Sequence, residues 1–253
     1  MPKTTAFHSR LEPLNQTGVW KNWSGYLVAP RYQYSITNEY YAVRNSVTLL
    51  DTSPLFKYKF TGQDARTLLR RAMARNIDNC KPGSAQYTTW CDEHGFVVQD
   101  GVVMHLGDNE YWLTSAEPSL RYFRNIARQM KLINVRVEDV STKYGILALQ
   151  GPHAYNVVKQ LSDDVGSLDY FGLVPTRIGT AKVVISRTGF TGDLGYELWI
   201  PTAHAVSIWD SLMEAGKGYN ITPLGTTGTW VNPPLPPLWK PHSPWTPSYS
   251  PSL

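Results

Sequence analysis

The sequence predicts an α+β protein built from two mixed halves. Segments with period-two alternation of apolar residues interleave with longer segments in which apolar residues recur at helical spacing. The 253 residues are enough to bury a sizeable core, and 42% hydrophobic against 17% charged residues excludes a charge-rich disordered chain. We expect the first half to span residues 1–140 and the second half 141–228, followed by a tail over 229–253.

Helices and strands are expected to alternate along the first half. In order, we expect a helix over 35–50, a strand over 55–61, a helix over 63–75, a meander of strands over 86–115, a helix over 118–131 and a strand over 133–140. The helices are predicted from apolar residues three or four positions apart, and Pro118 suits a first helical turn. Alternation in the first strand places Lys57 and Lys59 on the face opposite its aromatic residues. Turn signals at 92–95 and 107–109 divide the meander.

The second half repeats this arrangement. In order, we expect a strand over 144–149, a helix over 152–161, strands near 182–186 and 196–200, and a helix over 203–215. Each strand is a short, largely apolar run next to turn-forming residues. The boundary between the halves is expected near residues 138–144.

Residues 232–253 differ in composition from the rest of the chain. They hold 8 of the 18 prolines, 2 of the 9 tryptophans and no acidic residue. Proline lacks a backbone donor and disfavours helix in the residue before it, which predicts polyproline II or disordered coil. This segment could be a flexible tail, a ligand for an SH3 or WW domain through residues 233–237, or a foreign end produced by a frameshift or an unspliced segment.

Charge and cysteine content narrow the functional class. Lys and Arg number 24 against 20 Asp and Glu, and the resulting net charge of +4 is too small to indicate a nucleic-acid partner. Cys80 and Cys91 form no CxxC pair and the histidines show no metal-binding spacing, so we expect no metal site and a reducing, cytoplasmic location. No apolar run is long enough to predict a membrane partner, and the first residues lack the apolar region of a secretion signal.

The most specific local string is RTGFTGDLGYELWI at residues 187–200. Its three glycines, Gly189, Gly192 and Gly195, allow a tight turn and close approach to another molecule, and Glu197 follows at the start of an apolar strand. The spacing matches neither a P-loop nor GxGxxG, so it does not indicate phosphate binding. From the residues alone, a glycine-shaped hairpin with a surface glutamate is the favoured alternative.

Asp100 is the second candidate, because it lies in an apolar strand pair where a buried carboxylate is costly unless it is paired. It could serve as a general acid or base, or remain ionised beside a cationic intermediate. However, Asp100 and Gly101 also form the signature of a type I′ turn, which the residues alone favour. Tyr87 and Trp90 could be core aromatics, the commoner case, or a platform for a flat ring.

Together these strings resemble the folate-binding T-protein (aminomethyltransferase) family over about residues 20–225. RTGFTGDLGYE is similar to the family's RTGYTGEDGFE signature, GFVVQDGVV to GGVIDDLIV, and YYAVRNSVTLLDTS to its AVR-to-DVS helix and strand entry; LQGP recurs at 149–152. The resemblance implies the T-protein folate-binding fold, with two mixed ferredoxin-like halves.

The resemblance also implies a reaction, in which a one-carbon unit moves from an aminomethyl or methyl donor to N5 of tetrahydrofolate. Asp100 matches the catalytic carboxylate beside N5 and N10, and Glu197 matches the acid that accepts hydrogen bonds from the pterin amino and amide groups. Tyr87 matches a tyrosine that lines the folate funnel, and Phe190 and Leu55 take the positions of further pocket residues. The implied donor is a small molecule or a carrier-bound group.

The sequence departs from the family pattern around this pocket. The first of the paired aspartates is Gln99 here, the first tyrosine of the signature is Phe190, and DVSHM is DTSPL, which places Pro54 and Leu55 where the family has His and Met. The VNAAN stretch becomes LTSAEP at residues 113–118. These differences indicate a donor other than aminomethyl-lipoyl protein, such as a methylated small molecule.

The resemblance ends after NITPLGT, at residue 226. The family continues with an ALDxxRxEAG-like helix and a barrel that closes around the folate, whereas this chain does not. We therefore expect a truncated or aberrant product without the C-terminal barrel, and an in-frame continuation of the motif nearby in the locus. Two alternatives to an active transferase are a non-catalytic folate-binding scaffold and an adaptor that acts through the proline-rich tail.

Overall fold

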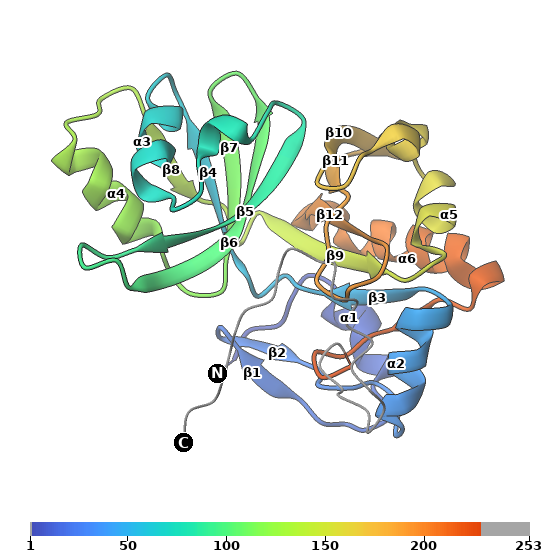
Figure 1. Ribbon diagram of the computed structural model, residues 1–253. Coiled ribbons are helices and arrows are strands. Elements are labelled where there is room, and N and C mark those ends of the chain that lie inside the picture. Colours follow the sequence, from blue (N-terminus) through green and yellow to red (C-terminus); the bar gives the residue numbers. More distant parts are fainter. Residues whose placement is uncertain (1, 229–253) are drawn as a thin grey trace.

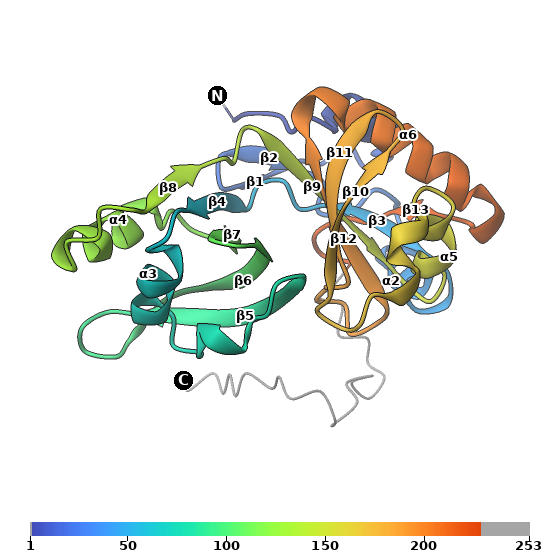
Figure 2. The ribbon, with the colours of Figure 1, turned by 90° about the horizontal axis from the view of Figure 1, so that it is seen from above.

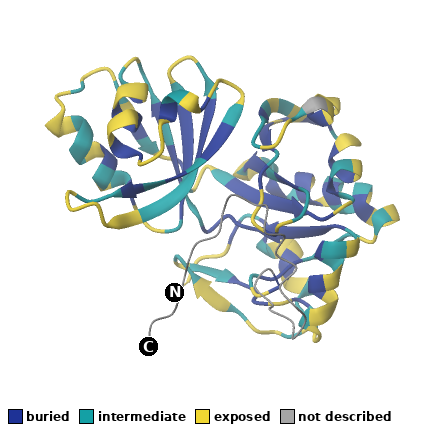
Figure 3. Cartoon of the chain, in the orientation of Figure 1, coloured by how far each residue is buried: buried dark blue, intermediate teal, exposed yellow. Residues whose placement is uncertain are grey.

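The computed structural model describes residues 2–228, except for the side chain of Ser167, and contains two main sheets that lie side by side (Figures 1 and 2). Helices pack against both main sheets, so the predicted mixed α+β class is confirmed. Over residues 2–228, neither sheet closes into a barrel. Buried residues follow the strands of both sheets (Figure 3). The predicted proline-rich tail lies outside the described residues.

The first main sheet has five strands in the order β5-β6-β7-β4-β8, and every neighbouring pair is antiparallel. Its strands are β4 (Phe56–Thr61), β5 (Ser84–Cys91), β6 (Val97–Gly107), β7 (Glu110–Ser115) and β8 (Arg136–Asp139). Helices α3 (Ala65–Ala72) and α4 (Leu120–Gln129) cover one face. Trp90, packed against Phe123, lies in the core beneath them, so this tryptophan is a core aromatic.

The second main sheet has six strands in the order β10-β11-β12-β9-β3-β13. Its strands are β3 (Thr48–Asp51), β9 (Tyr144–Gln150), β10 (Leu173–Ile178), β11 (Ala181–Ser186), β12 (Gly195–Pro201) and β13 (Thr222–Pro223). Helices α5 (Ala154–Lys159) and α6 (Ala205–Gly216) pack on one face. The predicted division at residue 140 stays a prediction; β3, which precedes it in the chain, pairs with β9, which follows it.

The remaining elements lie mainly at the N-terminal end of the chain and in the connections. They are α1 (His8–Leu11), β1 (Lys21–Trp23), β2 (Tyr26–Val28) and α2 (Ile36–Asn45), with the 3-10 turns η1 (Glu12–Leu14), η2 (Ile77–Asn79), η3 (Asp163–Ser167), η4 (Thr202–His204) and η5 (Lys217–Tyr219). Arg10, in α1, forms an ion pair with Asp210 of α6, with the closest atoms 2.7 Å apart. No helix within residues 2–228 combines the length and the apolar character that a bilayer crossing needs.

The two main sheets meet in a shared apolar cluster, on the face opposite α3 and α4 in the first sheet and opposite α5 and α6 in the second. The β3 end of the latter face is covered by α2 through Val43. The five-stranded sheet contributes Ala85, Met104 and Trp112, and the six-stranded sheet contributes Ile146, Leu173, Val184 and Trp199. The rings of Trp112 and Trp199 lie with their centroids 5.1 Å apart. At the edge of this contact the amide of Ala85 donates to the carbonyl of Phe171 at 2.7 Å. The two sheets are therefore joined by packing as well as by the chain.

Two sequence predictions are wrong in their local detail. The helix predicted over 35–50 ends at Asn45, and the apolar run that follows forms β3, which lies between β9 and β13 with all four residues buried. Asp100 and Gly101 do not form a hairpin turn, since both lie within β6 and pair with Thr89 and Thr88. In both cases a neighbouring strand, which periodicity cannot reveal, decides the conformation.

Lys57, expected on the outer face of its strand, is fully buried. The face of β4 opposite the helices is covered by the connections between the two sheets, and the Lys57 ammonium donates to the carbonyls of Ser53 at 2.6 Å and Leu55 at 2.8 Å. Burial lowers the pKa of Lys57 to about 8, although the carboxylates of Asp51 and Asp139 oppose that shift.

Stability should therefore rise with pH above about 8, where Lys57 loses its proton in the folded chain but keeps it to about 10.5 when unfolded. In this window the unfolded state binds more protons, so the free energy of unfolding should increase by at most about 1.4 kcal/mol per pH unit. Urea unfolding at pH 8 and 9.5 should show this rise in the wild type and not in Lys57→Met. The control is Lys59→Met, which removes a partly exposed lysine and should keep the rise in stability with pH. Equal slopes in the wild type and Lys57→Met would contradict the assignment.

Candidate functional site

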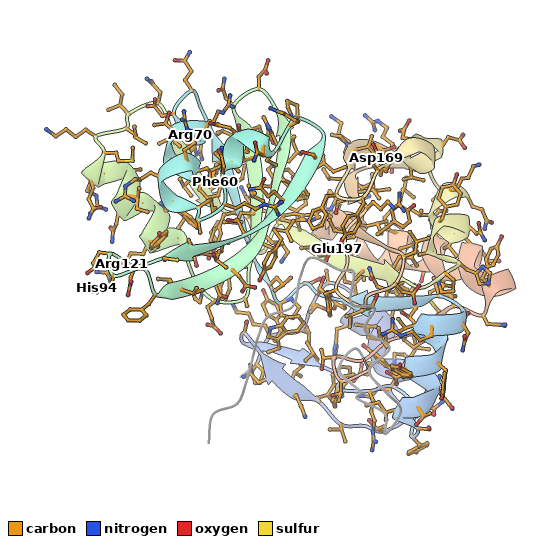
Figure 4. All side chains as sticks on the ribbon, viewed as in Figure 1. Phe60, Arg70, His94, Arg121, Asp169 and Glu197 are labelled. Carbon is orange, nitrogen blue, oxygen red and sulfur yellow. The ribbon has the colours of Figure 1, made fainter. Side chains whose placement is uncertain are left out.

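The faces that carry Asp100 and Glu197 lead to the same contact between the sheets. Side chains alternate along a strand, so Glu197 shares a face of β12 with Trp199, and Asp100 shares a face of β6 with Met104. Trp199 and Met104 belong to the apolar cluster that joins the sheets. Glu197 lies near the junction of the two sheets (Figure 4). The two carboxylates therefore approach this junction from different sheets.

Asp100 is held by the neighbouring strand. The hydroxyl of Tyr87, on β5, donates a hydrogen bond to the Asp100 carboxylate. Burial and this bond raise the pKa of Tyr87, which keeps its hydroxyl protonated as a donor. The next residue is constrained as well, because a Cβ on Gly101 would lie 1.8 Å from the carbonyl oxygen of Thr114. The Asp-Gly pair thus marks a close approach of two strands.

Gln99, at the position that the resemblance matches to the first of the family's paired aspartates, is turned back toward the main chain. Its side-chain oxygen accepts a hydrogen bond from the amide of Asp100 at 2.9 Å. Asp100 is therefore the carboxylate that β6 presents at this point.

Glu197 lies inside the six-stranded sheet, where it pairs with Ser186 on β11 and Ala148 on β9. The hydroxyl of Thr188 donates to its carboxylate, and the hydroxyls of Ser186 and Thr188 lie 2.7 Å apart. Burial raises the pKa of Glu197, and the bond from Thr188 partly offsets that shift. Its side chain is partly buried, in contrast to the surface glutamate that the residues alone favoured.

Residues 188–195 are called the glycine loop below. Two of its glycines, Gly189 and Gly195, leave room for the side chain of Gln150. A Cβ on Gly189 or Gly195 would lie 2.2 or 2.3 Å from the buried amide of Gln150, at the end of β9. The expectation that these two glycines admit another molecule is therefore corrected. Sequence reasoning missed Gln150; the signal was its place in the LQGP string.

Phe190 and Leu55 lie on other elements. Phe190, in the glycine loop, is 50% exposed. Leu55 is partly buried in the connection between β3 and β4, and its carbonyl accepts from the Lys57 ammonium. The structure thus brings Tyr87 and Asp100 into direct contact and places Glu197, Phe190 and Leu55 on separate segments.

An open groove of about 760 Å³ runs beside β10 and β11 on the other side of the sheet contact. Trp112, Tyr144, Pro175 and Val184 are among its lining residues, and none of the five predicted site residues lines it. Within the described part of the chain, no group of three or more His, Cys, Asp or Glu side chains is arranged to hold a metal ion.

Comparisons with curated proteins identify relatives over most of the chain. The chain is 31% identical to an aminomethyltransferase of Halothermothrix orenii, over 89% of this chain and 62% of the relative. It is 33% identical to an aminomethyltransferase of Bacillus subtilis, over 76% and 53%. It is 31% identical to a trimethylamine-oxide aldolase of Ruegeria pomeroyi, over 89% and 30%. The chain therefore spans less than two thirds of the length of these relatives.

Solved structures share the fold at low sequence identity. The glycine cleavage system aminomethyltransferase T from Bartonella henselae matches 90% of this chain and 61% of its own, with a TM-score of 0.77 and 20% identity. The heterotetrameric sarcosine oxidase from Corynebacterium sp. U-96 matches 70% and 87%, with a TM-score of 0.52 and 17% identity. A family model described as the GCVT N-terminal domain matches residues 8–230, and the chain therefore belongs to this family, that of the T-protein aminomethyltransferases.

Proposed function

We propose that this chain binds tetrahydrofolate at the junction of the two sheets and transfers a one-carbon unit to its N5 from an aminomethyl or methyl donor. The observation that carries the proposal is a carboxylate on each of the two facing sheets, Glu197 on β12 and Asp100 on β6. Relatives named aminomethyltransferases, at 31% and 33% identity, support the same reaction class.

The Glu197 carboxylate suits a pterin ring, which presents adjacent amino and amide N–H donors. An ionised carboxylate only accepts hydrogen bonds and has about four lone-pair sites. Thr188 uses one of these sites, which leaves others for a ligand. The hydroxyl of Ser186 contacts the hydroxyl of Thr188 and helps to orient it toward Glu197. This arrangement favours a planar ligand that donates two hydrogen bonds side by side.

Asp100 is proposed to act on the reacting atoms. Tetrahydrofolate supplies the N5 amine that accepts the one-carbon unit. As the bond from N5 to the one-carbon unit forms, the bond between that carbon and the donor's heteroatom would break and the donor would leave with the electron pair. The Asp100 carboxylate would accept the proton that N5 releases and stabilise positive charge that develops beside it. Tyr87, by donating to Asp100, holds one carboxylate oxygen and leaves the other for the substrate. Gln99 adds no second carboxylate, so Asp100 carries this role alone.

A second candidate is a folate-binding protein without turnover. Gln99 in place of an aspartate and the half-exposed Phe190 in place of a tyrosine both remove polar groups expected around the donor. Under this alternative Glu197 still binds the pterin, but Asp100 has no chemical step to assist.

Calorimetric titration of the full chain with tetrahydrofolate tests both candidates. We expect saturable binding of one molecule per chain. The loaded chain is then incubated with aminomethyl and methylated-amine donors, and formation of one-carbon folate is measured. Product would support the transferase, and binding without product from any donor would favour the second candidate. The absence of any binding heat, confirmed by equilibrium dialysis, would contradict both.

A further inference from the structure

Three strings that are far apart in the sequence converge on the glycine loop. The loop itself belongs to the RTGFTGDLGYE string, Gln150 comes from LQGP at the end of β9, and Arg44 comes from YYAVRNSVTLLDTS at the end of α2. Both outside residues form hydrogen bonds to the loop. Both reach Thr191, Gln150 through its hydroxyl and Arg44 through its carbonyl, but Gln150 is fully buried and Arg44 is partly exposed.

Gln150 holds the loop from within the protein, where its side chain is fully buried. Its amide oxygen accepts from the hydroxyl of Thr191 at 2.9 Å, and its amide nitrogen donates to the carbonyl of Thr188 at 3.5 Å. The same amide fills the space beside Gly189 and Gly195, near the two ends of the loop. One side chain therefore joins the start, the middle and the end of the glycine loop.

Arg44 holds only the tip of the loop. Its guanidinium donates to the carbonyl of Thr191 at 2.6 Å and lies 3.3 Å from the carboxylate of Asp193. These groups are partly exposed, with 24% and 29% of the Arg44 and Asp193 side chains accessible. Arg44 therefore restrains the outer part of the loop, at residues three and five positions beyond Thr188.

Gln150 is linked to Glu197 through Thr188. Gln150 donates to the main chain of Thr188, and the side chain of Thr188 donates to Glu197. Gly195, which packs on the Gln150 amide, also pairs with Gln150 across the sheet and precedes Glu197 by two residues. A shift of the amide would therefore move both the donor to Glu197 and the strand that carries Glu197.

We propose that Gln150 is a positioning residue for Glu197, because its amide keeps the hydroxyl of Thr188 in place as the donor to the Glu197 carboxylate. Only the effect of Gln150 on tetrahydrofolate affinity rests on the proposed function; its effect on Glu197 does not. An amide is needed because the site uses a donor toward Thr188 and an acceptor toward Thr191. Methionine would fill a similar volume without either bond, and asparagine would keep the amide but hold it one methylene short of both partners.

The test compares Gln150→Met with Arg44→Met as its matched control, each in the full chain. The first readout needs no ligand: the titration of the Glu197 carboxyl, followed by carbon NMR. Loss of the Thr188 hydrogen bond should raise the pKa of Glu197 in Gln150→Met, as in Thr188→Val, and the double variant should show no further rise. Arg44→Met should speed hydrogen exchange at residues 191–193 and leave the Glu197 titration unchanged.

The second readout is the Kd for tetrahydrofolate, which should rise about tenfold in Gln150→Met. Adding Thr188→Val should cause no further rise, because the two residues act through the same hydrogen bond and their effects are therefore non-additive. If the wild type binds no tetrahydrofolate, the proposed function fails while the NMR titration still decides the role of Gln150. An unchanged Glu197 titration in Gln150→Met, or additive effects in the double variant, would overturn the proposal. If Gln150→Met does not fold, Gln150→Asn, which stays uncharged but withdraws the amide from Thr188 by one methylene, gives the same comparison with Thr188→Val.

Discussion

Glu197→Gln should raise the Kd for tetrahydrofolate by about 10- to 150-fold, because a hydrogen bond to a charged group contributes roughly 1.5–3 kcal/mol. The variant keeps the size of the side chain but replaces one acceptor oxygen with an NH₂ donor, which would face the N–H donors of the pterin ring. Calorimetry on the wild type and the variant measures the change. Glu214→Gln, at an exposed position near the end of α6, is the control and should bind as the wild type does. Equal affinity of wild type and Glu197→Gln would remove Glu197 from the binding site.

The same residue should make binding depend on pH. Burial raises the pKa of Glu197 above that of an ordinary glutamate, and protonation would turn one of its two acceptor oxygens into a donor that opposes the pterin N–H groups. Affinity should therefore be highest above this raised pKa and fall as the pH drops through it. Glu197→Gln should show no corresponding fall, so the difference between the two pH profiles isolates the contribution of Glu197.

Asp100→Asn should lower the rate of one-carbon transfer by about 10² to 10⁴, the usual range for loss of a general acid or base. Asparagine keeps the shape of the side chain but neither takes up the proton nor carries the negative charge, so tetrahydrofolate affinity should change only slightly. Single-turnover transfer and calorimetry measure the two effects separately. Tyr87→Phe, which removes the donor to Asp100 but keeps the carboxylate, should have a smaller effect on rate.

Asp108→Asn is the control for this substitution, because Asp108 is exposed in the turn between β6 and β7. It should match the wild type in both rate and affinity. Transfer by Asp100→Asn at the wild-type rate would show that Asp100 does not act on the reacting atoms. A matched loss of folate affinity would instead assign Asp100 to binding.

Sequence patterns predicted most elements of both main sheets because alternation and helical spacing are local properties. The meander appears as β5, β6 and β7, with turns close to the two predicted positions. The errors arise where a second layer covers a face that periodicity treats as exposed. Lys57 is buried under the connections between the sheets, and the Asp100–Gly101 pair lies against the main chain of β7.

The candidate site could be predicted only in part from the sequence. The resemblance identified Asp100 and Glu197 one at a time, but local periodicity does not indicate that their strands present these side chains toward the same sheet contact. Gln150 was overlooked for a related reason: in sequence it is a polar residue at the end of an apolar strand. Its role depends on Gly189 and Gly195, about 40 residues further along the chain, which leave room for its amide.

The crystal structure of the full chain with tetrahydrofolate bound tests the central claim most directly. We expect the amino and amide groups of the pterin ring to donate to the Glu197 carboxylate, with N5 beside Asp100. A ring bound in the groove beside Trp112 and Tyr144, or anywhere that it touches neither carboxylate, would contradict this account.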